Sequence, residues 1–546
     1  ASADELYLTG LHLEQYRHAT RCPTLYWREA LRRDPGDARC HNALGLWHLK
    51  RGEFAAAETH FRKAIARLTR RNANPYDGEP FYNLGLCLRH QLDATADLES
   101  QISNLTFSEA YGAFYKATWN QAWASAGYHA LAEMDCRRGD WAAALDHLNR
   151  SLCFNTENTR ARDLKVIVLR RLKRADEAGA LLRNTLALDP LDWWARHLNG
   201  EPLTCDLQTA LDLAHDCARA GLHVEAIALL NRCLAGAAAG SQLGSPPAAD
   251  TALPDQNWGA RPLVCYTLGW LELRRGQTHA ALKQFHRAAR LSPDYCFPAR
   301  LEEIAILESA MRANPRDARA PYYLGNLLYD RRRRMEAIRL WERAAQLDPA
   351  FSVVWRNLGI GYFNVLNQPA KACRAYDRAF RANPRDARLL FERDQLWKRL
   401  GVTPVRRLRE LEPRRDLVRQ RDDLSIELCA LYNQTGQHDK ALALVSRRHF
   451  QPWEGGEGGP LGQWVRSHLA LGRAALQGGV GPASCLSPNA KRRAGAADRQ
   501  ETCSTTAAAH FQAALTAPPN LGEAKHLLAN QSDIHYWLGR ALAAGG

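Results

Sequence analysis

The sequence predicts an all-α fold, a right-handed α-solenoid built from helix–turn–helix repeats. Residues 318–351 repeat the pattern of residues 260–295, with the same residue types at the same offsets. Apolar residues recur at spacings of three and four, as they do in amphipathic helices. A sequence period of about 34 residues is typical of stacked helical pairs, each burying its apolar face against its neighbours. We therefore expect one array with a concave groove.

The two clearest copies share a Leu-Gly pair, a small residue, an aromatic, a second Ala and a Pro. These residues are Leu268, Gly269, Ala281, Phe285, Ala288 and Pro293 in one copy, and Leu324, Gly325, Ala337, Trp341, Ala344 and Pro349 in the other. Small residues let two helices approach, the aromatic fills the gap towards the next repeat, and Pro stops the second helix because it lacks an N–H. In this pattern the chain resembles the tetratricopeptide (TPR) repeat.

Further copies follow the same spacing along the chain. They centre on Gly45 and Phe61, Gly85 and Phe114, Gly139 and Trp141, Ala178 and Leu182, Ala214 and Ala226, Gly359 and Tyr376, Gly401, Gly436 and Ala441, and Phe511 and Ala514. Residues 533–544 are expected to form a capping helix. From the regularity of the copies we predict three parts, which are residues 1–260, the most regular repeats at 261–400, and degenerate repeats at 401–546.

Three stretches interrupt the period, near residues 92–108, 235–257 and 478–506. They are rich in Ala, Gly, Ser, Thr and Pro, and each falls between the helices of a repeat or after one. We predict exposed loops there, since the entropy of closing a loop grows slowly with its length.

Composition limits the function classes. The formal charge of +15 permits contact with RNA, but the basic residues are spread along the chain, which makes nucleic acid an unlikely partner. No apolar run is long enough to cross a membrane. The 14 Cys form no CxxC pair and no zinc-like spacing with His, which favours a reduced, cytoplasmic setting. No catalytic, cofactor or metal motif occurs, so we expect no metal, no cofactor and no enzyme activity from this chain alone.

Several segments at repeat junctions place aromatic rings beside carboxylates and amides. "NPYDGEPFYNLG" from Asn74, "LDPLDWWARHLNGE" from Leu188 and "HFQPWEGGEGG" from His449 are examples. The candidate ligand or junction residues are Tyr76, Asp77, Trp193, Trp194, Trp453, Glu454 and Glu457. Such groups can stack on sugars and bind hydroxyls, but they can equally cover turns and cap helices. For the loop at Trp453 we favour an ordered junction, in which Glu454 and Glu457 accept hydrogen bonds from the next helix.

In these segments, and in "NLGEAKHLLANQSDIHYWLG" from Asn520, the chain resembles a group of bacterial proteins. In that group a TPR array follows an N-terminal, mutarotase-like β-sandwich domain of unknown function. The resemblance implies an array that works beside a carbohydrate-handling domain. We therefore expect such a domain upstream of this chain, and an accessory role in a carbohydrate-active enzyme is the alternative function.

The leading prediction is a protein-interaction scaffold that holds a peptide or partner domain in its groove. First helices of repeats should line this groove, with the following side chains: Tyr322, Asn326, Tyr329, Arg356, Asn357, Phe363 and Arg388. Asn326, Asn357 and Arg388 lie where TPR co-chaperones that grip a terminal carboxylate place similar groups. Tyr322 and Glu392 stand where that clamp has basic residues, which argues against it here.

Overall fold

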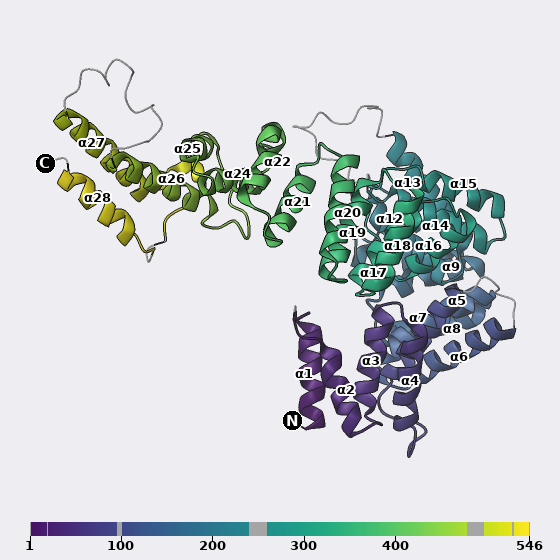
Figure 1. The fold of residues 1–546 in the computed structure, drawn as a ribbon. Coiled ribbons are helices and arrows are strands. Elements are labelled where there is room, and N and C mark those ends of the chain that lie inside the picture. The colour runs from purple at the N-terminus through teal and green to yellow at the C-terminus, as the bar shows by residue number, and fades with distance from the viewer. Residues whose placement is uncertain are drawn as a thin grey trace. The chain divides into compact units, whose positions relative to one another are not determined.

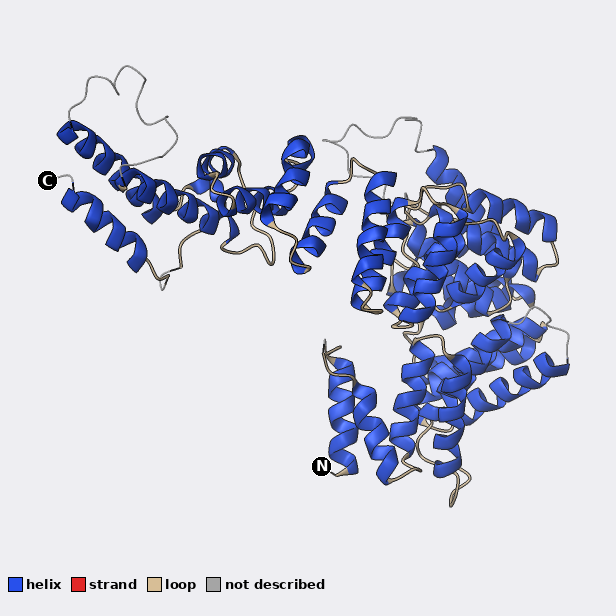
Figure 2. Ribbon diagram, viewed as in Figure 1, coloured by secondary structure: helices blue, strands red, loops and turns tan. Residues whose placement is uncertain are grey.

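The computed structural model describes residues 2–18, 20–94, 101–239, 259–477, 496–526 and 529–544. Within these ranges the chain consists of helices, turns and loops, and no strand occurs (Figure 2). The chain divides into two compact units, Ala1–Pro349 and Ala350–Gly546, called unit 1 and unit 2 below. Each unit is described by itself.

Unit 1 holds helices α1 to α18, most of which are labelled in Figure 1. They are α1 (Ala3–Gln15), α2 (Pro23–Arg33), α3 (Ala38–Lys50), α4 (Phe54–Leu68), α5 (Glu79–Ala94), α6 (Gln101–Ala117), α7 (Gln121–Arg138), α8 (Trp141–Phe154), α9 (Thr159–Arg171), α10 (Ala175–Leu188), α11 (Trp193–Leu198), α12 (Leu207–Arg219), α13 (His223–Ala239), α14 (Arg261–Arg274), α15 (Thr278–Ala288), α16 (Glu302–Ala313), α17 (Arg319–Asp330) and α18 (Arg334–Leu347).

Unit 2 holds the remaining helices, including two short 3₁₀ turns. They are α19 (Ser352–Asn364), α20 (Pro369–Ala382), α21 (Ala387–Arg399), α22 (Pro404–Leu411), η1 (Glu412–Arg414), α23 (Arg415–Val418), α24 (Asp422–Gln434), α25 (His438–Arg447), α26 (Gly459–Leu476), α27 (Ala496–Leu515), η2 (Pro519–Leu521) and α28 (Ser532–Ala544). In both units consecutive helices pack as hairpins, which confirms an α-solenoid of TPR-type repeats.

A glycine opposite an aromatic ring brings the two helices of a hairpin together. A Cβ atom added to Gly85 would lie 2.6 Å from the ring of Phe114, and one added to Gly359 would lie 2.6 Å from the ring of Tyr376. The same pairing recurs at Gly10 and Trp27, Gly45 and Phe61, Gly269 and Phe285, Gly325 and Trp341, and Gly472 and Phe511. The small residues therefore mark the points of closest helix contact, as the sequence predicts. The aromatic ring, which was expected to fill the gap towards the next repeat, lies against the glycine of its own hairpin.

Several second helices end at a proline, as predicted. The residue before the proline is the first that leaves the helix. Helices α2, α10, α16, α18 and α20 each end one residue before an Asp-Pro or Asn-Pro pair. The Asp or Asn before Pro is extended, with φ and ψ of −134° and 96° at Asp189, because the proline ring excludes the helical region there. Two residues after the Pro, Asp37, Asp192, Asp317 and Asp386 accept hydrogen bonds from the next backbone N–H groups.

Unit 1 departs from an array in which each repeat touches only its neighbours. Helix α5 packs against α16, and α7 packs against α12. Nη1 of Arg333 also donates to the carbonyl oxygens of Arg51 and Gly52, at 3.3 and 3.2 Å. These contacts join segments up to 282 residues apart, so the inner helices of this unit face one another across one turn of the superhelix. The expectation of nearest-neighbour packing is wrong for this unit.

The interrupting stretches are shorter than predicted. Residues 92–94 and 101–108 are helical, as are residues 235–239 and 496–506. What remains of the three predicted loops, residues 95–100, 240–257 and 478–495, lies outside the described residues. The predicted divisions after residues 260 and 400 stay predictions, whereas the compact units divide at Pro349. Among the described helices, none is long and apolar enough to span a membrane.

Candidate functional site

Inner helices of unit 1 enclose a polar cavity of about 520 Å³, which we call the inner chamber. Its walls come from α5, α7 and α12, and from the loop between α8 and α9. The lining residues are Tyr82, Arg89, Ala122, Ser125, Ala126, His129, Ala130, Glu133, Asn155, Asn158, Arg160, Asp216 and Arg219. Because every wall belongs to unit 1, the chamber is defined within one compact body.

Helical spacing explains how α7 builds the main wall. Its six lining residues are Ala122, Ser125, Ala126, His129, Ala130 and Glu133, and each has another of the six three or four positions away, so they share one face of the helix. Ala122, Ala126 and Ala130 are small, and they leave room between the polar side chains. On α5, Tyr82 and Arg89 are seven residues apart and also share a face.

Ion pairs fix the charged wall of the chamber. Nη1 of Arg89 lies 2.5 Å from Oε2 of Glu133, and both side chains are almost fully buried. Arg219 pairs with Asp216 on its own helix and donates from Nη1 to Oε1 of Glu302 at 2.7 Å. Oε1 of Glu133 lies 3.7 Å from Nε of Arg219. The network joins α5, α7, α12 and α16, because a buried charge needs an opposite partner.

Burial and charge set the protonation of this wall. Burial alone would raise the pKa of Glu133, but attraction to the guanidinium groups of Arg89 and Arg219 outweighs it and lowers that pKa. The pKa of Asp216 is raised, chiefly by burial, despite the neighbouring Arg219. Burial also lowers the pKa of His129, which keeps its imidazole neutral. A neutral imidazole can donate from one nitrogen and accept at the other.

Several polar groups of the chamber remain able to bind a ligand. His129 has no hydrogen-bond partner among the described residues, and the side chain of Arg160 is 62% exposed, with Nε 3.4 Å from Asp216. Asn155 and Asn158 accept from backbone N–H groups through Oδ1, at 3.1 and 3.2 Å. Their amide nitrogens are then left as donors. Donors and acceptors thus stand side by side along one wall.

The seven residues predicted to line one groove are divided between the two units. In unit 1, Tyr322 is only 6% exposed, with its ring centroid 5.2 Å from that of Tyr323. Oδ1 of Asn326 accepts a hydrogen bond from Nε1 of Trp341 at 3.1 Å. Tyr329 is half-buried, with its ring centroid 5.1 Å from that of Trp341. Tyr322 is therefore buried beside a ring of its own repeat, and Oδ1 of Asn326 is bonded within its own hairpin, so neither group simply faces an open groove.

In unit 2 the predicted groove residues surround Glu392. Nη2 and Nε of Arg356 lie 2.6 and 2.7 Å from its two carboxylate oxygens, and Nε of Arg388 lies 2.9 Å from Oε1. The two guanidinium groups are therefore already paired with an internal carboxylate, which agrees with the argument against a carboxylate clamp. Phe363 lines a smaller cavity of about 240 Å³ beside Glu392, and Asn357 is half-buried on the same helix. Whether these residues bind a partner stays a prediction.

The first two junction segments support helix ends. Oδ1 of Asp77 accepts from the backbone N–H of Glu79 at 3.0 Å, at the start of α5. Tyr76 is 93% exposed, Trp194 is buried, and the guanidinium of Arg196 lies 4.4 Å from the ring centroid of Trp193. Four cavities within the described residues have no tryptophan in their lining. None of these four cavities therefore has the tryptophan wall that a common sugar site would need.

The loop around Trp453 is held from a distant segment. Trp453 packs against the core that surrounds Leu424 and Leu428, and Gly456 leaves the space that its indole occupies. Oε1 and Oε2 of Glu523 accept from the backbone N–H groups of Gly458 and Leu461, at 2.8 and 3.0 Å. Glu454 and Glu457 are exposed. The prediction that these two carboxylates accept the hydrogen bonds of the next helix is wrong, because Glu523 does so.

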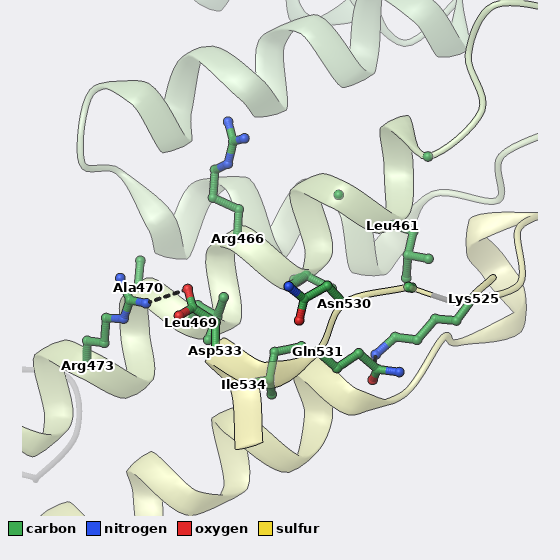
Figure 3. A pocket seen from close by; sticks show the side chains of 14 residues that line it. Leu461, Arg466, Leu469, Ala470, Arg473, Lys525, Asn530, Gln531, Asp533 and Ile534 are labelled. Carbon is green, nitrogen blue, oxygen red and sulfur yellow. Dashed lines mark hydrogen bonds and ion pairs between the residues drawn. The ribbon is translucent and has the colours of Figure 1, made fainter. Parts of the chain in front are cut away.

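A second large cavity, of about 490 Å³, lies between α26 and the chain that leads into α28 (Figure 3). Leu461, Val465, Leu469 and Ile534 give it an apolar side, while Nη2 of Arg473 pairs with Asp533 at 3.3 Å. Nζ of Lys525 donates to the carbonyl of Ala514 and to Oε1 of Gln531, at 2.7 and 3.1 Å. The ion pair joins α26 to α28, and Lys525 joins the chain before α28 to the end of α27.

Sequence reasoning did not find the inner chamber. Its charged residues lie on helices that face each other only because the superhelix turns back within unit 1. One available signal was the presence of Arg89, Glu133 and Asp216 among apolar neighbours on otherwise buried helices. Charged residues are rarely buried without a partner, so each implied an opposite charge elsewhere in the fold. No group of His, Cys, Asp or Glu within the described residues is arranged to hold a metal ion.

No protein-family model matches the chain. Among solved structures, PilF of Pseudomonas aeruginosa is 16% identical, with 44% of this chain and 89% of that chain covered and a TM-score of 0.24. YrrB, described as a TPR protein with an unusual peptide-binding site, is 16% identical, with coverages of 43% and 92% and a TM-score of 0.15. Naa15/Naa10 bound to HypK is 14% identical, with coverages of 100% and 78% and a TM-score of 0.25. TM-scores this low carry no argument about function.

Proposed function

We propose that the chain is a protein-interaction scaffold that binds an extended peptide segment in the inner chamber of unit 1. The observation that supports this most is the chamber wall itself. It places a neutral His129, the exposed guanidinium of Arg160 and two asparagine amides beside a cavity of about 520 Å³. Ligand pockets typically have volumes of roughly 300–1,000 Å³.

The chemistry of the wall fits a peptide better than a cofactor. Small-molecule and cofactor sites are mainly apolar, with few polar groups. The chamber instead presents charged, amide and imidazole groups along small alanines. An extended backbone offers alternating N–H and C=O groups, which such a wall can pair. The internal ion pairs of Arg89 and Arg219 hold the wall in place before the ligand arrives, which lowers the entropy cost of binding.

The test uses peptides selected from a displayed random library on the immobilised full chain. Their affinities are then measured by fluorescence anisotropy for the wild type and for Ala126→Trp, which fills the chamber. We expect Ala126→Trp to weaken binding by about tenfold or more, because the indole occupies the space of the ligand.

Ala142→Trp is the matched control, since Ala142 is exposed on the outer helix α8 and does not line the chamber. It should change affinity by less than about twofold. Circular dichroism checks that both variants fold. Selected peptides that bind a folded Ala126→Trp variant as tightly as the wild type would contradict the proposal.

A further inference from the structure

A separate cavity of about 420 Å³ in unit 2 is rimmed by positive charge, and we call it the basic cavity. Its walls come from α23, α24 and α25. The lining residues are Arg415, Val418, Arg419, Ser425, Leu428, Tyr432, Lys440, Ala443, Leu444, Arg447 and Arg448. Five of them are cations, and none is an acid. The cavity shares no residue with the inner chamber.

Neighbouring carboxylates neutralise only part of this rim. Arg415 and Lys440 both donate to Oε1 of Glu412 at 2.9 Å, so two cations share one carboxylate. Nε of Arg448 lies 2.5 Å from Oδ1 of Asp422.

Two further cations are left for a ligand. Arg419 lies 3.6 Å from an entirely exposed Asp416, a contact that water screens. Arg447 is exposed and has no ion-pair partner among the described residues.

The floor of the basic cavity is apolar. Val418 and Leu428 belong to the buried core, and Leu444 packs against it from the wall. The cavity exists where the preceding helix is short. Helices α18 and α20 have 14 residues each, but α22 has 8, after which the chain turns through η1 and α23. In place of a longer helix, the chain that follows forms α23, whose Arg415 and Val418 line the cavity opposite α24 and α25.

We propose that the basic cavity binds an acidic peptide segment that inserts an apolar side chain between its carboxylates. Arg419 and Arg447 on the rim supply complementary charge to glutamate or aspartate, while the floor of Val418, Leu428 and Leu444 receives the apolar anchor. Nucleic acid fits less well, because binding of single strands needs exposed aromatic rings, and Tyr432 is only 3% exposed. Residues 478–495 of the same unit contain no Asp or Glu, so that segment lacks the required charge.

The experiment measures the anisotropy of a fluorescein-labelled peptide of glutamates around a central leucine, with the full chain as titrant. We expect saturable binding, and binding about tenfold weaker or more for the double variant Arg419→Glu with Arg447→Glu. The matched control is Arg374→Glu with Arg385→Glu, which makes the same change of net charge at exposed positions of unit 2 outside the cavity. The control should bind within about threefold of the wild type.

Four further results decide the proposal. A peptide with serine in place of leucine should bind more weakly, which supports the apolar anchor, and equal binding would overturn it. Equal weakening by both double variants would show that only net charge matters, and would overturn the site. A labelled single-stranded oligonucleotide would reassign the cavity to nucleic acid if it binds more tightly than the peptide and if its affinity falls in the double variant Arg419→Glu with Arg447→Glu but not in the control. Ala142→Trp and Ala126→Trp should leave this binding unchanged, which separates it from the chamber.

Discussion

Gly85 and Gly112 belong to the same helical hairpin but have different surroundings. A Cβ atom at Gly85 would lie 2.6 Å from Phe114, whereas one at Gly112 would have no neighbour within 4 Å. The space around Gly85 therefore admits no larger residue without movement, whereas only helix propensity acts on the exposed Gly112. The pair separates packing from propensity within a single structural element.

We predict opposite effects of alanine at these two positions. Gly85→Ala should lower the free energy of unfolding by about 1–3 kcal/mol, because the added methyl group overpacks a close helix contact. Gly112→Ala should raise it by about 0.5–1 kcal/mol, because alanine loses less backbone entropy in a helix. Chemical denaturation of both variants measures the two changes. A stabilised Gly85→Ala variant would show that the helices do not meet at this glycine.

At the scale of elements, the junction before α26 depends on a residue far along the chain. Glu523 binds two backbone N–H groups at the start of that helix, and Nδ2 of Asn520 donates to the carbonyls of Val445 and Arg448, at 2.9 and 2.8 Å. The Gly-rich loop at Trp453 is thus held between the two helices by the segment that follows α27. The loop between α25 and α26 is therefore an ordered junction between two helices.

We predict that Glu523→Ala destabilises the chain by about 1 kcal/mol, since it removes two hydrogen bonds and a negative charge from a helix N-terminus. Glu454→Ala and Glu457→Ala serve as controls and should stay within about 0.5 kcal/mol of the wild type, because both side chains are exposed. Thermal melts of the three variants provide the comparison. A larger loss at Glu454 or Glu457 than at Glu523 would restore the original interpretation of this loop.

The elements show what a sequence pattern can and cannot reveal. Gly359 and Tyr376 lie within one repeat, so the repeat spacing marks both residues as packing positions, although it does not show that they contact each other. The stretches at 101–108 and 496–506 were expected to be loops, yet small and polar residues also fit a helix once it has a partner. The cap from Glu523 and the chamber wall join segments far apart in sequence. No periodicity indicates which segments a superhelical turn brings together.

At the scale of the whole molecule, unit 1 buries ionisable groups where its inner helices meet. His215 is 2% exposed, and burial lowers its pKa to about 4. Burial likewise lowers the pKa of His223 to about 4. Burial and the neighbouring Asp192 raise the pKa of Asp163 to about 9. The histidines favour the folded state as the pH rises, whereas Asp163 favours it as the pH falls. A variant that removes one titrating group isolates its contribution.

We predict that His215→Leu flattens the dependence of stability on pH. The unfolded imidazole, with a pKa near 6.5, binds a proton as the pH falls, whereas folded His215 resists protonation down to about pH 4. Its contribution is present above pH 6.5 and is lost as the pH decreases, by about 1 kcal/mol near pH 5.5. Urea denaturation near pH 7.5 and near pH 5.5 measures the difference between variant and wild type. An unchanged slope would show that this side chain is not buried as a neutral group.

The central claim, that a peptide occupies the inner chamber of unit 1, is tested most directly by hydrogen–deuterium exchange of the full chain with a selected peptide. The first turn of α9 follows Asn158 and contains Arg160. Its first N–H groups have no carbonyl partner within the helix, and Oδ1 of Asn158 accepts from that of Ala161. We expect the peptide to slow exchange in residues 155–162 and along α7, and to leave the outer helices α8 and α10 unchanged. Protection confined to segments that do not line the chamber would contradict the claim.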